Sequence, residues 1–362
     1  NQQMKRVLTI IRWLVGLLFI FSGLVKANDP LGLSYKMQEF FEVWGWNGFH
    51  DYTLSLSVIM NTFEIGAGVA VIVGWQQKLV NWLLLLLIIF FSFLTGYALL
   101  SGKIKTCGCF GDCLPLTPAQ SFGKDLVLLL LILVLFFSTV AGGRNKVAGF
   151  AVFVAVLFTS ALQWYVLKHL PLVDCLPYKA GNNIAEQMKQ PAGAVPDSMS
   201  IVFTYRKNGK ALTFDQDHFP PDFDSTYQYV GRQDKIARKG NGLQPAIPEF
   251  AIQTITGMDT TSALFASSGN YLLVMAKDMN GVDQWKAALE TVAGKALQEK
   301  KIPLFLVTAE PEKATVLFPQ YHILKCDAIV LKTAARVRPT FFLMKGATIV
   351  KKLAYTDAGK IW

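Results

Sequence analysis

Five apolar stretches limit what this chain can fold into. They run over residues 7–25, 54–74, 79–100, 122–141 and 147–166. Each is close to the ~20 residues that an α-helix needs to cross ~30 Å of hydrocarbon. Only 17% of the residues are charged, against about 25% in soluble domains. The sequence therefore predicts a membrane protein whose residues 1–167 form an α-helical bundle of five transmembrane helices.

Basic residues in the short loops predict the orientation of these helices. Lys5 and Arg6 precede the first span, Lys78 follows the second, and Arg144 and Lys146 separate the fourth from the fifth. Cytoplasmic loops are enriched in Lys and Arg. We therefore expect a bacterial inner-membrane protein with a cytoplasmic N-terminus. The loop after the third span and all residues beyond the fifth span would then lie in the periplasm.

Glu64 is the intramembrane polar candidate, because it lies in the middle of the second span. A carboxylate in hydrocarbon is costly and is a functional-site hypothesis by default. The alternative is a protonated side chain that is bonded to a neighbouring helix. Lys124 and Asp125 open the fourth span, and we interpret them as interfacial residues.

Cysteines gather at the predicted periplasmic face. The loop between the third and fourth spans contains Cys107, Cys109 and Cys113, and Cys175 follows the fifth span. Such thiols can form a structural disulfide, exchange with a partner or ligate a soft metal. The loop has no His and lacks the Cys-x2-Cys spacing of zinc sites, so we assign no metal ligands. Redox activity is the preferred interpretation, and a structural bridge and a metal site are the alternatives.

The spacing within the loop suggests roles for the four cysteines. Gly108 allows a tight backbone between Cys107 and Cys109. A Cys-x-Cys bridge is strained, and strained bridges are more oxidising. We therefore expect Cys107 and Cys109 to be the exchanging pair. Cys113 and Cys175 would be bridged to each other or act as a relay.

Three motifs resemble the DoxX/MauE family of membrane proteins over roughly residues 5–140. They are FSGLVKANDPLG at residues 21–32, Glu64-Ile-Gly in the second span and CGCFG at residues 107–111. The resemblance implies a four-helix bundle that is related in plan to quinone-linked, disulfide-forming membrane proteins. It implies redox handling of periplasmic thiols, with a quinone as the candidate cofactor. The fifth span and the long C-terminal extension depart from the family's pattern and leave the substrate open.

The extension divides into two predicted parts. Residues 168–247 are rich in Pro, Gly and Asp, and we interpret them as a linker with a small β module. Alternating strands there flank Asn208-Gly209, the strongest short signal for a β-hairpin turn. Residues 248–362 show a strand, a helix, a strand and a hairpin in that order. This order indicates an α/β domain.

The second part resembles a thioredoxin-like domain. The sequence VRPT at residues 337–340 precedes the final hairpin, so Pro339 is the cis-proline candidate. The redox pair of that fold would follow the strand that begins at Tyr271, and no cysteine occurs there. The domain is therefore predicted to bind or present a partner without dithiol chemistry, with Cys326 as an inert core residue. The fold ends on a helix, so further residues are expected after the last one given.

The sequence predicts thiol–disulfide exchange with an envelope protein at the periplasmic face of the lipid bilayer, so oxidoreductase activity is a hypothesis. The alternative is a non-catalytic scaffold or accessory subunit with structural disulfides. No Lys/Arg cluster indicates nucleic acid, and no dinucleotide-binding or P-loop motif is present. The sequence names neither the substrate nor the oligomeric state.

Overall fold

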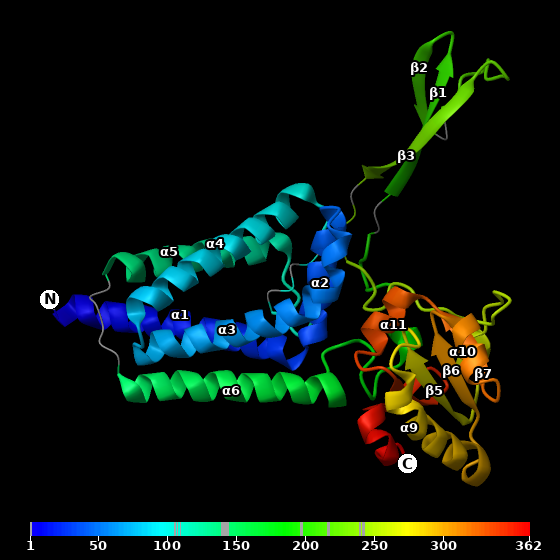
Figure 1. The fold of residues 1–362 in the computed structure, drawn as a ribbon. Helices are drawn as coiled ribbons and strands as arrows, with labels where there is room; N and C mark the ends of the chain where they lie inside the picture. The colour runs from blue at the N-terminus through cyan, green and yellow to red at the C-terminus, as the bar shows by residue number, and fades with distance from the viewer. Residues whose placement is uncertain are drawn as a thin grey trace.

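The computed structural model describes residues 2–104, 106, 108, 110–138, 145–195, 198–215, 218–238, 240 and 243–362. Within these residues, five helical segments are long and apolar enough to cross a membrane. The helices are α1 (Gln2–Asn28), α3 (Thr53–Val73), α4 (Gln77–Ser101), α5 (Pro118–Ser138) and α6 (Lys146–His169). The predicted membrane bundle followed by an α/β domain is confirmed (Figure 1).

Small and polar residues hold the bundle together. Helices α1 and α3 approach closely at glycines, since a Cβ at Gly16 would lie 2.8 Å from the carbonyl oxygen of Gly68. Such close backbone contacts are typical of membrane helices. Helix α6 lies along α3, where the Asn61 amide donates to Oε1 of Gln163 at 3.0 Å. The fifth span is therefore packed into the bundle.

The segment between the first two spans contains a helix that the sequence analysis did not anticipate. Helix α2 (Pro30–Val43) begins with a proline in its first turn, and the Asp29 carboxylate accepts from the Gly32 amide at 3.1 Å. Both features favour a helix start. A 3-10 turn, η1 (Asn47–Tyr52), leads from α2 toward α3. Helix α2 crosses the end of the bundle that faces the α/β domain (Figure 1).

The small β module is an antiparallel sheet of order β2-β1-β3. Its strands are β1 (Ser198–Lys207), β2 (Lys210–Asp215) and β3 (Gln228–Arg238). The predicted hairpin is confirmed, because β1 pairs with β2 around Asn208 and Gly209 at φ 50° and 76°. The third strand was not anticipated. The module projects away from both other parts of the molecule (Figure 1).

The α/β domain is built on a six-stranded mixed sheet of order β4-β7-β6-β5-β8-β9. The strands are β4 (Ile252–Gln253), β5 (Asn270–Ala276), β6 (Leu304–Thr308), β7 (His322–Cys326), β8 (Thr340–Lys345) and β9 (Thr348–Ala354). Strands β5, β6 and β7 are parallel, and β8 and β9 form the predicted antiparallel hairpin. The helices are α8 (Thr261–Phe265), α9 (Val282–Gly294), α10 (Pro311–Leu317) and α11 (Ala328–Ala334). The domain also contains a short π-helix, η2 (Lys295–Glu299), and a 3-10 helix, η3 (Tyr355–Lys360).

Two apolar cores cover the two faces of this sheet. Trp285 of α9 is buried on one face, and Leu331 of α11 on the other. Tyr178 and Ile184 join the second core, and a short helix, α7 (Ile184–Gln187), lies in this segment. Part of the segment 168–247 is thus in contact with the α/β domain. It is the first part of the segment, whose apolar side chains are buried there.

Candidate functional site

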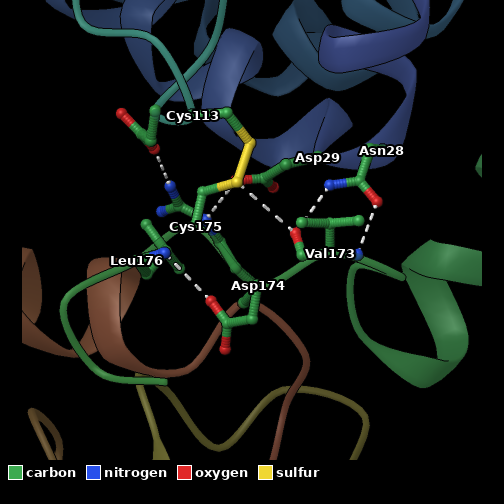
Figure 2. Close-up of a disulfide and its surroundings, with 9 residues drawn as sticks. Asn28, Asp29, Cys113, Val173, Asp174, Cys175 and Leu176 are labelled. Carbon is green, nitrogen blue, oxygen red and sulfur yellow. Dashed lines mark hydrogen bonds and ion pairs between the residues drawn. A yellow bond between two sulfur atoms is a disulfide. The ribbon is translucent and has the colours of Figure 1, made fainter. Parts of the chain in front are cut away.

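A disulfide joins the loop before α5 to the segment that follows α6. Cys113, before α5, is bonded to Cys175, after α6, with their Cα atoms 4.9 Å apart across 62 residues of sequence (Figure 2). Both half-cystines are partly exposed. Cys107 and Cys109 lie outside the described residues. Of the four candidate cysteines, the structure thus brings two together.

An aspartate precedes each bridged cysteine, and each aspartate is held by a cation of the α/β domain. Nη2 of Arg336 donates to Oδ2 of Asp112 at 2.6 Å. Nζ of Lys352 donates to Oδ2 of Asp174 at 2.7 Å. The side chains of Arg336 and Lys352 are only 5% and 2% exposed. Nε of Arg336 also donates to Asp29 at the start of α2, at 2.8 Å.

Burial and charge act on these two cations in opposite directions. Burial by itself lowers the pKa of Arg336, but the carboxylates of Asp29 and Asp112 outweigh it and raise this pKa. Burial lowers the pKa of Lys352, and Asp174 only partly opposes this. The ammonium of Lys352 therefore depends strongly on its aspartate partner.

Further bonds lie where the end of the bundle meets the segment after α6 and the α/β domain. The Asn28 amide donates to the Val173 carbonyl at 2.8 Å, and the Val173 amide donates back at 3.1 Å (Figure 2). At the end of α6, His169 Nδ1 lies 2.6 Å from a carboxylate oxygen of Asp357 in η3. Contacts at several points therefore set how the domain sits on the bundle.

An apolar cavity lies between α2 and the other helices of the bundle. It extends to the loop between α4 and α5 that contains Cys107, Cys109 and Cys113, which we call the cysteine loop. Helices α1, α2, α3, α4 and α5 contribute to it, and Gly108 lines it from the loop. Gly108 has a φ of +68°, and a Cβ there would lie 3.0 Å from Cγ of Lys36. The other lining residues are Ser22, Lys26, Leu33, Lys36, Met37, Phe40, Phe41, Trp44, Leu56, Met60, Phe90, Phe91, Leu94, Thr95 and Lys124. The helical spacing of Leu33, Met37, Phe40 and Trp44 after an Asp-Pro start is the signal that could have revealed α2.

Glu64 is fully buried and is bonded to α1. It forms an ion pair with Lys26, and Oγ of Ser22 donates to it at 3.2 Å. Helix α1 extends to Asn28, beyond the apolar stretch at residues 7–25, and places Lys26 inside the bundle. The carboxylate thus has a partner on a neighbouring helix, as the alternative interpretation held, although that partner is a cation.

Asp125, which we expect at the membrane interface, is enclosed by other side chains of the bundle. Helix α5 begins at Pro118, so Asp125 lies two turns inside it and is fully buried. Oγ1 of Thr95 donates to its carboxylate at 3.0 Å, and Nζ of Lys124 lies 2.5 Å away. Two buried carboxylates therefore lie in the bundle near the cysteine loop. Both line a small pocket that Phe110 of that loop also lines.

The α/β domain has no thiol at the end of its first long strand. The peptide bond before Pro339 is cis, and Arg338 forms an ion pair with Asp278 just after β5. Cys326 ends β7 and is buried, which raises its pKa to about 12. A thiol with such a pKa stays protonated at neutral pH. Among the described residues, no group of three His, Cys, Asp or Glu is placed to hold a metal ion.

This fold and site define a membrane-spanning helical bundle that buried ion pairs hold against an α/β domain, with a disulfide beside them. The profile of the family described as methylamine utilisation protein MauE matches residues 4–138, which contain α1 to α5 and the cysteine loop. A domain of unknown function matches residues 199–239, the small β module.

Part of the chain is also similar to a curated protein. A protein named TlpB from Flavobacterium psychrophilum is 26% identical over 161 residues, which make up 43% of this chain and 43% of that protein. The match thus spans less than half of that relative's length. No solved structure matches the chain.

Proposed function

We propose that this protein exchanges thiols and disulfides with a partner protein at the periplasmic face of a bacterial inner membrane. The cysteines that we assign to this exchange are Cys107, Cys109, Cys113 and Cys175. One observation carries the proposal: the loop that contributes Cys113 to a disulfide also lines an apolar cavity through Gly108. Gly108 lies between Cys107 and Cys109 in the sequence, and for this reason we assign the exchange to that pair.

Thiol–disulfide exchange transfers two electrons and two protons between two pairs of cysteines. A thiolate on one protein attacks a disulfide sulfur of the other, and a mixed disulfide forms. The second thiol of the attacking pair then releases the mixed disulfide. The pair that began as two thiols ends as a disulfide, and two electrons and two protons pass to the other pair. Exchange itself needs no further reactant, whereas repeated turnover needs an electron carrier.

The quinone that the family resemblance implies fits the chemistry of the cavity. A quinone ring needs an apolar slot with hydrogen-bond donors for its carbonyl oxygens. The cavity offers aromatic walls such as Phe40 and Phe91, and ammonium groups on Lys36 and Lys124. When bound there, a quinone would supply a sink for two electrons and two protons.

The buried carboxylates beside this cavity suit proton handling. The Glu64 carboxylate accepts from both Lys26 and Ser22, so it is held in one orientation between α1 and α3. The Asp125 carboxylate is fixed between Lys124 and Thr95. Lys26, Lys124 and Thr95 also line the cavity. We infer that these pairs hold protons near the site where thiols are oxidised.

We propose that residues 248–362 form a thioredoxin-like domain, separated from the bundle at 1–167 by a linker and small β module at 168–247. The order of its strands and the cis peptide before Pro339 support this proposal. The disulfide also supports a second candidate function, because it joins the loop before α5 to the segment after α6. In that case the protein is a scaffold, and Cys113–Cys175 is a structural staple.

Partner oxidation by reconstituted protein separates the two functions. The full chain in proteoliposomes is mixed with reduced, unfolded ribonuclease A and a short-chain ubiquinone, and thiol loss is followed. We expect oxidation by the wild type and at least about a hundredfold loss in Cys107→Ser and Cys109→Ser. Cys326→Ala is the matched control and should retain full activity. Full activity in both serine variants would favour the scaffold.

Ligand binding tests the cavity independently of turnover. Quenching of tryptophan fluorescence by the short-chain ubiquinone should report binding next to Trp44. Gly108→Val fills the space against Lys36 and should weaken binding by at least about tenfold. Ser268→Val, on the exposed surface of the α/β domain, is the control. Equal binding by all three proteins would remove the cavity from the proposal.

A further inference from the structure

We propose that the α/β domain is a clamp that keeps the thiols of Cys113 and Cys175 within bonding distance when their disulfide is reduced. Arg336 and Lys352 act as its positioning residues. The inference rests on the proposed exchange function, because a clamp matters most for a disulfide that opens and closes. It gives a role to a domain that has no thiol of its own at the position where a redox pair would lie.

The two half-cystines have the same arrangement of neighbouring charged residues. Asp112 and Asp174 each lie one residue before a bridged cysteine, and each carboxylate is bonded to a different cation of the same domain. Arg336 follows α11, and Lys352 lies in β9, so the sheet and its helix fix the separation of the cations. The backbone of both Asp-Cys dipeptides is therefore anchored to one rigid body. Figure 2 shows the Cys113–Cys175 disulfide and Asp174 between the helices of the bundle and the α/β domain.

The two ion pairs do not depend on the sulfur–sulfur bond. Both cations are buried, and a buried cation without a partner is strongly destabilising. Reduction of the disulfide changes neither Asp112 nor Asp174, so Arg336 and Lys352 keep their carboxylate partners. The clamp therefore survives reduction, and the two thiols remain neighbours at a high effective concentration. Closure of the disulfide then costs little chain entropy.

A third contact ties the clamp to the bundle. Arg336 also binds Asp29 at the start of α2 and lies over the ring of Tyr35 in the same helix. Helix α2 forms one wall of the apolar cavity. One guanidinium thus links the disulfide loop, the cavity wall and the α/β domain. Arg336 is suited to this because its planar fork can bond two carboxylates at once.

The test measures the stability of the disulfide, with the full chain in lipid nanodiscs. The protein is equilibrated in glutathione or dithiothreitol redox buffers, and Cys113 and Cys175 are quantified by differential alkylation and mass spectrometry. We expect Arg336→Gln and Lys352→Met each to shift the equilibrium toward the dithiol by about tenfold, the effect of one lost charge-assisted hydrogen bond. Reoxidation after removal of the reductant should slow to a similar extent.

A matched control distinguishes a clamp from simple docking. Asp357→Asn removes the ion pair to His169, which holds the same domain on α6 without touching either Asp-Cys dipeptide. We expect its redox equilibrium to lie within about twofold of the wild type. Asp112→Asn and Asp174→Asn make the same test by neutralising the carboxylate of each ion pair, and they serve if Lys352→Met fails to fold. Clamp variants that match Asp357→Asn would overturn the inference.

Failure of the clamp and failure of the proposed function give different results. The redox equilibrium of Cys113 and Cys175 is measurable without any partner or quinone. If partner oxidation is absent but the clamp variants shift this equilibrium, the clamp stands and the exchange function fails. If partner oxidation is present and the equilibrium is unchanged, the function stands and the clamp is refuted.

Discussion

Lys26 of α1 is bonded to Glu64 of α3 inside the membrane bundle, and neither side chain is more than 3% exposed. The pair lies beside the cavity that Gly108 also lines, since Lys26 contributes to that cavity. A charged pair at this depth is costly to bury unless both partners are satisfied. Ser22 supplies a further bond to Glu64 at 3.2 Å, so this polar cluster holds α1 against α3 next to the cysteine loop.

Removing the carboxylate should destabilise the bundle. Glu64→Ala leaves Lys26 as a buried cation without its partner, and we expect a loss of about 3 kcal/mol in the free energy of unfolding. Denaturant unfolding of the purified protein in detergent micelles measures this. The double variant Lys26→Met with Glu64→Met is the control, because it removes both charges and should recover most of the stability. A Glu64→Ala protein as stable as the wild type would refute a buried ion pair.

The proposed orientation is tested with single cysteines at exposed positions. Ser268→Cys lies in the α/β domain and Lys78→Cys in the first turn of α4, and both sites are exposed. In a background with Cys107→Ser and Cys109→Ser, an impermeant maleimide should label Ser268→Cys in intact spheroplasts. Lys78→Cys should react only after lysis. The reverse pattern would place the α/β domain in the cytoplasm.

Cys326 should be chemically inert in the folded protein. Burial raises its pKa to about 12, so the reactive thiolate is scarce at neutral pH. Iodoacetamide at pH 7.5 should leave Cys326 unmodified over hours, and addition of denaturant should allow full alkylation, as measured by mass spectrometry. Rapid modification without denaturant would show that β7 opens readily.

The ion pair between Asp278 and Arg338 should make stability depend on pH in the acidic range. Burial by itself raises the pKa of Asp278, but Arg338 and the Asn280 amide outweigh it and hold this pKa below its usual value. A carboxyl with a depressed pKa contributes stability above its unfolded-state pKa, and this contribution disappears as the pH falls through the folded-state value.

Thermal unfolding of an Asp278→Asn variant checks this sign. Its melting temperature should lie below that of the wild type at pH 6, and the difference should shrink as the pH is lowered toward 3. The pair is partly exposed, since Arg338 is 42% exposed, so high salt should also reduce the difference. A difference that grows on acidification would contradict the assigned ion pair.

Local sequence patterns predicted much of the fold. The five spans follow from their length and apolar character, and the hairpin at Asn208-Gly209 follows from a turn that needs two residues at positive φ. Helix α11 and helix α2 were not anticipated. The apolar run at residues 328–332 is too short for its period to distinguish a helix from a strand. Helix α2 has 14 residues, so a search for apolar stretches of ~20 residues does not detect it.

The sequence alone determined which segments enter the membrane, where the thiols lie along the chain and which domain lacks a redox pair, because these are properties of composition and local period. Only the tertiary structure decided that Cys113 meets Cys175 and that Arg336 and Lys352 hold the aspartates beside them. These residues are separated by 62 to 224 positions. No local pattern records which distant segments meet, because that depends on how the bundle and the sheet each pack an apolar core and on the ion pairs that then hold them together.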